Sequence, residues 1–481
     1  MDKSFFGHPS GLSTLFFTEM WERFSYYGMR AILILFMTSK VAEGGLGLQT
    51  ADAGVIYGLT TAMVYMAALP GGWIADQFLG LRRAVFIGGI LIAAGNFCLV
   101  IPSMFAFYAG LALIVAGTGL LKPNVSAIVG QLYTPEDSRR DAGFSIFYMG
   151  INTGALIAPL LCGWVAQYNW RYGFGLAGIG MIIGLVQYVL GGRNLGDAGL
   201  VPAGGTDTAK LRRRLILGLA VLTGIVAGVI ILGFAGIVTA KGIADASGLV
   251  LLTIVVVFFG WLLVSSQWNT VERKRLIVIL GLFLAAAIFW SVFEQAGSTL
   301  NLFAERSTEN RILGREFPAP WYQSVNSMFL IALAPVFAWL WVRLGPKEPS
   351  SPAKFALGLL LVGLGFLVLS VGSAAAESGV RVSPLWLVAT YLCHTMGELC
   401  LSPVGLSAMT KLAPPSVTGL MMGVWFLALS VGNYMGGRMA SMYESLPLPT
   451  LFGVVGAFAI VAGVVLVMFV RPMVRLMGGV R

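Results

Sequence analysis

Long apolar runs recur along this chain from end to end, and they restrict its fold more than any other feature. Two of these runs, Leu215 to Val238 and Gly248 to Val264, contain no charged residue. A helix needs roughly 20 consecutive apolar residues to cross a bilayer, and the runs approach or exceed that length. Only 11% of all residues are charged, against about 25% in ordinary soluble domains. The sequence therefore predicts an all-α polytopic membrane protein.

The order of the apolar runs predicts fourteen spans in three parts. Residues 1–190 contain six spans, residues 191–268 contain a basic linker and two extra spans, and residues 269–481 contain six more. Six plus six spans is typical of a transporter with two similar six-helix bundles and a binding site near mid-membrane between them. The two charge-free spans in the middle are expected to face lipid as a scaffold.

The positive charges of the chain indicate its orientation in the membrane. With the N-terminus inside, about 20 lysines and arginines fall in cytoplasmic segments and about 8 outside, as the positive-inside rule requires. The net charge of +10 is thereby explained without a nucleic-acid partner. We expect a multi-pass protein of a bacterial cytoplasmic membrane with both termini in the cytoplasm. The basic clusters on the expected inner side are Arg82–Arg83, Arg139–Arg140, Arg212–Arg214 and Arg273–Arg275.

The first predicted span carries charges that an ordinary membrane helix would not tolerate. Its polar residues follow helical spacing, so they form one stripe along the helix. A charge at mid-bilayer is costly, and such residues usually face a cavity and pair with one another. This stripe is therefore expected to face a polar interior. Its members are Glu19, Glu22, Arg23, Tyr26, Tyr27 and Arg30.

The charges inside the predicted spans divide by sign between the two halves. The cations Arg23, Arg30 and Lys122 lie in the first half, and the carboxylates Glu294 and Glu398 lie in the second. A cavity between the halves would be positive on one wall and negative on the other. Its natural guest is a zwitterion such as a short peptide with free ends. Further polar or aromatic candidates on the spans are Tyr148, Asn152, Trp290, Gln323, Asn326, His394, Ser402 and Trp425.

The loop between the second and third spans reads GGWIADQFLGLRRAV and resembles the inner loop of the major facilitator superfamily. Asp76 lies near a helix end, and Arg82 and Arg83 follow it. A carboxylate and arginines in that position can pair in one conformation and separate in another. We expect these three residues to take part in gating.

Several motifs in the right order are similar to those of the proton-dependent oligopeptide transporter family. The resemblance covers nearly the whole chain, and the two extra central spans are similar to those of bacterial members. The motifs are EMWERFSYYG in span 1, GGWIADQFLGLRRAVFIGGILIAAG across spans 2 and 3, GLLKPN in span 4, FSIFYMGINTGAL in span 5, FWSVFEQAGSTL in span 7, LGPKEPSSPAKF before span 9 and GELCLSPVGLS in span 10.

The resemblance implies a proton-coupled symporter that imports di- and tripeptides by alternating access. The only coupling ion would be the proton, with no other cofactor and no metal, and the unit would be a monomer. It implies proton coupling by Glu19, Glu22 and Arg23, and an outer gate formed by Arg30 and Glu294. The implied substrate-binding residues are Arg23, Tyr26, Tyr27, Tyr65, Lys122, Asn152, Trp290, Glu294, Asn326, Glu398 and Trp425.

Other functions remain open at this point. Some relatives of the family move other solutes, such as nitrate, an amino acid or a drug. A membrane enzyme is disfavoured because the sequence has no HExxH, GxSxG or Walker pattern. A receptor would need a soluble output domain, and a channel would not need charged pairs across a closed pocket. The intramembrane charges could also serve only to cross-link helices, and His394 could be a packing residue.

Overall fold

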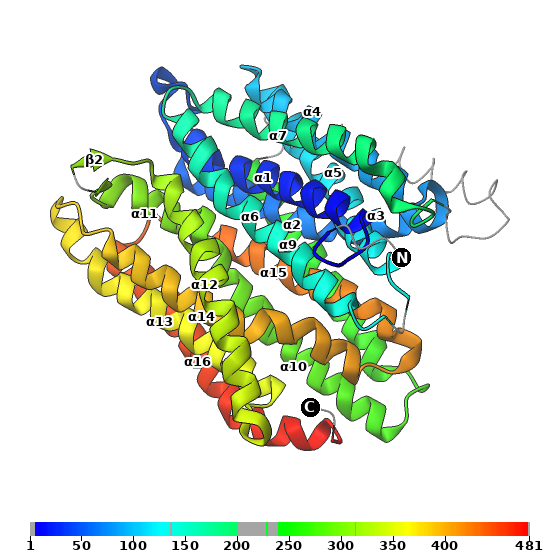
Figure 1. Ribbon diagram of the computed structural model, residues 1–481. Helices are drawn as coiled ribbons and strands as arrows, with labels where there is room; N and C mark the ends of the chain where they lie inside the picture. Colours follow the sequence, from blue (N-terminus) through cyan, green and yellow to red (C-terminus); the bar gives the residue numbers. More distant parts are fainter. Residues whose placement is uncertain (1–4, 135–136, 201–227, 229–238, 313, 480–481) are drawn as a thin grey trace.

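A computed structural model describes residues 5–134, 137–200, 228, 239–312 and 314–479. Two bundles of long helices lie side by side, with α1–α7 in blue to green-cyan and α10–α16 in green to red (Figure 1). The first bundle contains α1 (Gly11–Thr38), α2 (Thr50–Met66) with its continuation α3 (Ala68–Ile74), α4 (Leu81–Val100), α5 (Met104–Gln131), α6 (Arg140–Ala166) and α7 (Trp170–Leu190).

The second bundle also has six long helices among the described residues. It contains α10 (Thr270–Phe293) with its continuation α11 (Thr299–Ser307), then α12 (Tyr322–Leu344), α13 (Ser351–Ser373), α14 (Leu385–Leu412), α15 (Met421–Ala440) and α16 (Leu448–Leu476). Between α11 and α12, the strands β1 (Arg311–Ile312) and β2 (Arg315–Glu316) form a short antiparallel hairpin.

The number of spans agrees with the sequence as far as the described residues extend. Eleven helical segments are long and apolar enough to cross a membrane. The helices α1 and α14, each of 28 residues, have the length of a span as well. The remaining predicted span, 215–238, lies outside the described residues apart from residue 228, so the count of fourteen stays a prediction.

The extra helix α9 (Ala240–Val264) packs against α2 of the first bundle and against α10 and α15 of the second. Arg438 of α15 forms a salt bridge with Asp245 at 2.9 Å, and the Tyr434 hydroxyl donates to the Ala244 carbonyl at 3.0 Å. Only 17% of the most apolar part of α9 is buried. This placement agrees with the expectation that a central span acts as a lipid-facing scaffold.

Local signals in the sequence explain where some of these helices begin. The α10 helix starts with a capping box, in which the Asn269 side chain accepts from the Glu272 amide and the Glu272 carboxylate accepts from the Asn269 amide, both at 2.9 Å. Such a box satisfies amide groups that have no partner within the helix. The α7 helix begins similarly, with the Asn169 side chain accepting from the Arg171 amide at 2.9 Å.

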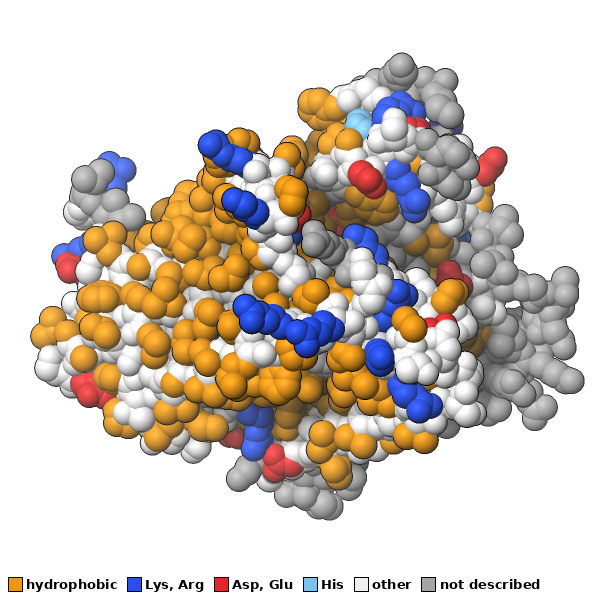
Figure 2. All heavy atoms as spheres, turned by 90° about the horizontal axis from the view of Figure 1, so that it is seen from below, with side chains coloured by type: hydrophobic (Ala, Val, Ile, Leu, Met, Phe, Trp, Pro, Cys, Tyr) orange, Lys and Arg blue, Asp and Glu red, His pale blue; other side chains and the backbone are white. Residues whose placement is uncertain are grey.

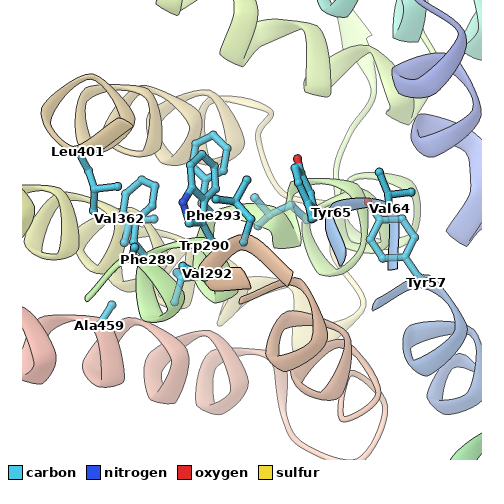
Figure 3. Close-up of a cluster of buried hydrophobic side chains, with 14 of the residues drawn as sticks. Tyr57, Val64, Tyr65, Phe289, Trp290, Val292, Phe293, Val362, Leu401 and Ala459 are labelled. Atoms are coloured by element: carbon cyan, nitrogen blue, oxygen red, sulfur yellow. The ribbon is translucent and has the colours of Figure 1, made fainter. Parts of the chain in front are cut away.

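Apolar packing joins the two bundles through a core that runs from α2 to α16. In Figure 3, Tyr57, Val64 and Tyr65 of α2 lie on one side, and the aromatic side chains of α10 lie on the other. Phe289 and Trp290 continue this core toward α13, α14 and α16. The core therefore lies close to the polar residues of the site.

The two ends of the molecule differ. We call the end with the β1–β2 hairpin the hairpin end, and the end with residues 5–10 and 470–479 the terminal end; Figure 1 places both termini away from the hairpin. The described hydrogen bonds and salt bridges that join the two bundles lie on the hairpin side of mid-membrane, as detailed below.

Glycines of α2 and α15 bring the backbones of the two bundles close together. A β-carbon on Gly58 would lie 2.4 Å from the Cα of Gly437, and a β-carbon on Gly437 would lie equally close to the Cα of Gly58. Real β-carbons do not approach a backbone atom so closely, so any side chain here must push the helices apart. Small residues at such crossings allow close helix packing in membranes.

We predict that Gly58→Val opens the hairpin end. Spin labels on cysteines at positions 43 and 381, in a background lacking the four native cysteines, would report the separation of the bundles by double electron–electron resonance. The variant is expected to shift the distances upward, because valine cannot fit against Gly437. Gly260→Val in α9 is the matched control, since no atom lies within 4 Å of its β-position. Unchanged distances in Gly58→Val would contradict this role of the glycine contact.

Candidate functional site

The charged stripe of α1 forms a compact buried group centred on Arg23. The Arg23 Nε lies 3.2 Å from Glu19 Oε1 and also donates to Glu22 Oε2. All three residues are no more than 2% exposed. Glu19 Oε2, Glu22 Oε1 and Arg23 Nη2 have no hydrogen-bond partner among the described residues. One guanidinium is thus shared by two carboxylates, and part of its bonding capacity remains unused.

Lys122 of α5 adds a second positive charge to the same wall. Its Nζ lies 4.2 Å from the centre of the Tyr65 ring and 5.9 Å from the centre of the Phe426 ring. Cation–π contacts of this kind hold an ammonium group without neutralising it. Lys122 forms no salt bridge with any residue in the described part of the chain. The positive charge therefore remains available to an anion.

The opposite wall carries an unpaired carboxylate on α14. Glu398 Oε2 accepts a hydrogen bond from the Asn326 amide of α12 at 3.2 Å, and the same amide nitrogen lies 2.9 Å from Thr395 Oγ1. Within the described ranges, no cation forms a salt bridge with Glu398. Asn326 thus orients the carboxylate and leaves its negative charge uncompensated.

A cavity of about 240 Å³ lies between these two walls. A water molecule takes about 30 Å³ of liquid volume, so the cavity has room for a small solute. The predicted residues that line it are Glu19, Arg23, Tyr27, Arg30, Tyr65, Lys122, Asn152, Trp290, Glu294, Asn326, Glu398 and Trp425.

Two predicted site residues do not line the cavity in this conformation. Glu22 lies behind Arg23 and reaches the site only through it. Tyr26 is 2% exposed, and its ring lies under the guanidinium of Arg23 at 5.3 Å. Helical spacing puts these residues on the charged stripe, but it does not distinguish the middle of the stripe from its edges.

The cavity is closed toward the hairpin end by Arg30 and Glu294. Arg30 Nη2 lies 2.6 Å from Glu294 Oε2 and donates to the Glu294 carbonyl at 3.3 Å. The Nε of the same arginine donates to the Tyr57 hydroxyl at 2.7 Å. Because Arg30 belongs to the first bundle and Glu294 to the second, this ion pair has the position that the sequence predicts for a gate.

Side chains of the second bundle also donate to backbone carbonyls of the first. The Ala31 carbonyl accepts from the amides of Asn301 at 2.7 Å and Gln323 at 3.3 Å. Three further bonds of this kind close the hairpin side: Trp321 to Leu160 at 3.0 Å, Ser324 to Leu156 at 2.7 Å and Ser430 to Ala62 at 2.9 Å. No hydrogen bond or salt bridge among the described residues joins the bundles on the terminal side of the cavity.

A polar cluster at the surface of the hairpin end completes this closure. Thr50 at the start of α2 donates to Glu444, which also forms a salt bridge with Arg306 at 2.7 Å. The hydrogen bonds from Thr50 and Arg306 hold the pKa of Glu444 below its ordinary value. This cluster therefore keeps its charges in mildly acidic solution.

The predicted pairing of Asp76 with Arg82 and Arg83 is not formed in this conformation. The Arg82 Nε instead donates to the Ala198 carbonyl at 2.6 Å, in the segment that follows α7. The Gly199 amide donates to Gln131 Oε1 at 2.7 Å, which fixes the same segment against α5. Residues 191–200, the start of the predicted basic linker, thus pack on the first bundle.

Comparison with known proteins gives the family of the chain. Residues 82–453 match the family model described as PTR2, the POT family. The chain belongs to the POT family. Its members are transporters, so the chain is a transporter and not an enzyme, and its two bundles have the fold of the major facilitator superfamily. With its many apolar helices, it is a multi-pass protein of a bacterial inner membrane.

Similarity to individual POT family proteins extends over the full length. An uncharacterized transporter of Bacillus subtilis is 43% identical, and the match covers 99% of this chain and 97% of the relative. A di-/tripeptide transporter of Lactococcus lactis is 39% identical, and the match covers 100% of this chain and 99% of the relative. A solved peptide transporter in complex with sulfate has a TM-score of 0.94 and 44% identity, covering 100% of both chains. A POT family transporter in complex with 5-aminolevulinic acid has a TM-score of 0.92 and 36% identity, covering 98% of both.

The cavity also includes aromatic or polar residues that the sequence did not indicate, namely Phe293, Ser327, Tyr391 and Phe426. The further candidates on the spans, Tyr148, Gln323, His394 and Ser402, line it as well. Tyr391 lies seven residues before Glu398 on the same helix face, so extending the α14 pattern would have found it. Phe426 gives no signal of its own, because it follows Trp425 in an apolar run. His394 touches the cavity but is 1% exposed and lies against Phe366, with ring centres 5.2 Å apart.

We predict that Arg30 and Glu294 are strongly coupled in stability. Breaking a buried ion pair from one side leaves an uncompensated charge and costs about 3–5 kcal/mol, whereas removing both charges costs much less. Arg30→Gln and Glu294→Gln should therefore each lower the melting temperature of the purified protein, and the double variant should melt above both. Additive losses would mean that the two side chains do not depend on each other.

Proposed function

We propose that this POT family member is a proton-coupled symporter that imports di- and tripeptides. The observation that carries the proposal is the separation of charge across the cavity. Among the described residues, Lys122 of the first bundle and Glu398 of the second each lack a salt bridge. A short peptide with free ends brings a carboxylate and an ammonium group, and so provides each wall with its missing partner.

The cavity lining suggests how a peptide would lie. Its carboxylate would reach Lys122 and the unused Nη2 of Arg23, while its ammonium group would reach Glu398 and the oxygen of Asn326. Asn152 faces the same space and could hold the peptide bond. The aromatic residues Tyr27, Tyr65, Trp290 and Trp425 leave room for apolar side chains of different sizes. Relatives described as di-/tripeptide transporters support this choice of substrate.

Proton coupling would follow from competition for Arg23. A peptide carboxylate that takes part of the guanidinium leaves Glu19 or Glu22 less well paired in a dry site. A carboxylate that loses its cationic partner takes up a proton more readily. Each proton that moves inward gains roughly 2.3 kcal/mol per 100 mV, enough for about fiftyfold accumulation of a neutral zwitterion.

In the proposed orientation, the hairpin end faces outward and the terminal end faces the cytoplasm. The basic residues at the terminal end support this orientation. The Arg30–Glu294 pair would then be an outer gate, and the described conformation is closed to the outside. Alternating access would break these contacts and form others near Asp76, Arg82 and Arg83. We propose that a monomer carries out the whole cycle, with protons as the only coupling ions.

Uptake of labelled dialanine into proteoliposomes tests the proposal directly. An inward proton gradient should drive accumulation above the external concentration, and a protonophore should abolish it. Unlabelled dipeptides should compete, whereas free alanine should not. Equal competition by alanine, or transport that ignores the proton gradient, would favour a transporter for a different solute.

We predict that Glu22→Gln abolishes uphill uptake and leaves exchange of peptide across the membrane. Glutamine keeps the size and hydrogen bonding of the side chain but cannot take up a proton. Counterflow of labelled dialanine, measured without a proton gradient, serves as the control for folding and binding. Normal accumulation by this variant would remove Glu22 from the coupling role.

We predict that Glu398 recognises the amino terminus of the peptide. Glu398→Gln should weaken competition by dialanine but should matter much less for N-acetyl-dialanine, which binds poorly to begin with. A cycle that combines the variant with ligand acetylation should give a coupling of at least about 1 kcal/mol. A coupling near zero would mean that Glu398 only braces α14 against Asn326.

A further inference from the structure

A group of cations at the terminal end is not used by the cavity or its gates. Three of them lie in the first turns of α10, and two lie in the last turns of α16. We call this group the α10–α16 basic patch, and it consists of Arg273, Lys274, Arg275, Arg471 and Arg475. All but Arg275, which is half-buried, are exposed.

The two parts of this patch are neighbours in space. The Arg275 Nε donates to the Met477 carbonyl at 3.2 Å, which joins the first turns of α10 to the end of α16. Arg471 and Arg475 are spaced by four residues and so project from the same side of α16. On the face seen in Figure 2, the broad left part is mostly hydrophobic, and most Lys and Arg side chains lie in the middle and right.

The protein itself does not neutralise the patch. None of its five cations forms a salt bridge with a described residue. The nearest acid in sequence, Glu272, uses its carboxylate to cap α10. Two other cations at the terminal end have partners, since Arg82 binds backbone carbonyls and Lys354 pairs with Glu348. Arg343, Lys347 and Lys411 also form no salt bridge with a described residue, but they lie at the ends of α12 and α14 and not on α10 or α16.

The patch also lies at the edge of the apolar surface of the same helices. The α16 helix has 29 residues and is about 43 Å long, against about 30 Å for the hydrocarbon core. Its charged residues, Arg471 and Arg475, lie in the last turns, which places these turns outside the hydrocarbon core. Val467, Met468 and Phe469, just before Arg471, are 51%, 72% and 55% exposed. The cations therefore stand where exposed apolar side chains end.

We propose that the α10–α16 basic patch binds the phosphate headgroup of an anionic phospholipid of the inner leaflet. The acyl chains would cover the exposed apolar face of α16, and the headgroup would bring the negative charge that the patch lacks. Basic residues beside a cytoplasmic helix end are attracted to anionic lipids in this way. The positive-inside rule alone accounts for the side of these cations, but not for their grouping on two adjacent helices without an acidic partner. The proposal rests on the orientation given under the proposed function.

The test compares two variants that lose the same charge at the same end. The patch variant is Lys274→Gln with Arg471→Gln and Arg475→Gln. The control variant is Arg343→Gln with Lys347→Gln and Lys411→Gln, which lie at the ends of other helices of the second bundle. Binding of spin-labelled phosphatidylglycerol is measured relative to spin-labelled phosphatidylcholine, on protein in vesicles of phosphatidylethanolamine and phosphatidylcholine. Melting temperatures show whether each variant is folded.

The wild type and the control variant should prefer phosphatidylglycerol, and the patch variant should lose this preference by roughly tenfold or more. Raising the salt concentration should weaken the preference of the wild type, which tests the same claim without a substitution. Equal preference in both variants, no preference in the wild type, or displacement of the lipid by millimolar inorganic phosphate would overturn the proposal. Lipid binding does not require transport, so this result is independent of the outcome with dialanine.

Discussion

The sharing of Arg23 between Glu19 and Glu22 is the interaction on which the rest of the site depends. Three charges in one buried group are tolerated only because they pair with one another, since a lone charge inside a membrane is very costly. Two carboxylates on one arginine leave this group with a net negative charge, while Lys122 lies on the same wall without a salt bridge to either carboxylate. Any ligand that binds Arg23 weakens its pairing with Glu19 and Glu22. Protonation of one of these carboxylates is the simplest way to remove the unpaired negative charge.

The need of buried charges for partners also explains the contacts between the two bundles on the hairpin side. On the hairpin side, the hydrogen-bond partners of Arg30 in the described part of the chain are Glu294 of the second bundle and Tyr57. Opening that side would separate Arg30 from Glu294 inside the protein. The two charges would then need new partners, from water or from substrate. The hydrogen bonds to backbone carbonyls, such as Asn301 to Ala31, are neutral and cost less to break. A strong central pair surrounded by weaker bonds allows the closure to be both specific and reversible.

Much of the site could be predicted from the sequence because the costs of burying charge are severe. Arg23, Lys122 and Glu398 are polar residues in spans that should be apolar, and the structure places all three on one cavity. The details of closure could not be predicted in this way. A backbone carbonyl such as that of Ala31 carries no sequence signal, and the glycine contact between Gly58 and Gly437 depends on how the bundles cross.

The inner loop marks another limit of sequence reasoning. Asp76 and Arg82 were expected to act together in gating, yet Arg82 binds the carbonyl of Ala198, far away in the chain. Apolar patterns predict the helices, and intramembrane charges predict the site. An arginine at the start of a helix, however, has many hydrogen-bond acceptors within reach. Which acceptor Arg82 binds depends on the conformation of the whole transporter, and a sequence pattern does not contain that conformation.

The central claim is that opposite charges on the two walls hold the two ends of one peptide. The most direct measurement is competition for dialanine uptake by dialanine amide in the wild type and in Lys122→Gln. Amidation should weaken competition strongly in the wild type, because a buried positive charge loses its partner, and this penalty should largely disappear in the variant. N-acetylation should remain harmful in both proteins. If the amide competes as well as the free acid in the wild type, the positive wall is not the carboxylate site and the account is wrong.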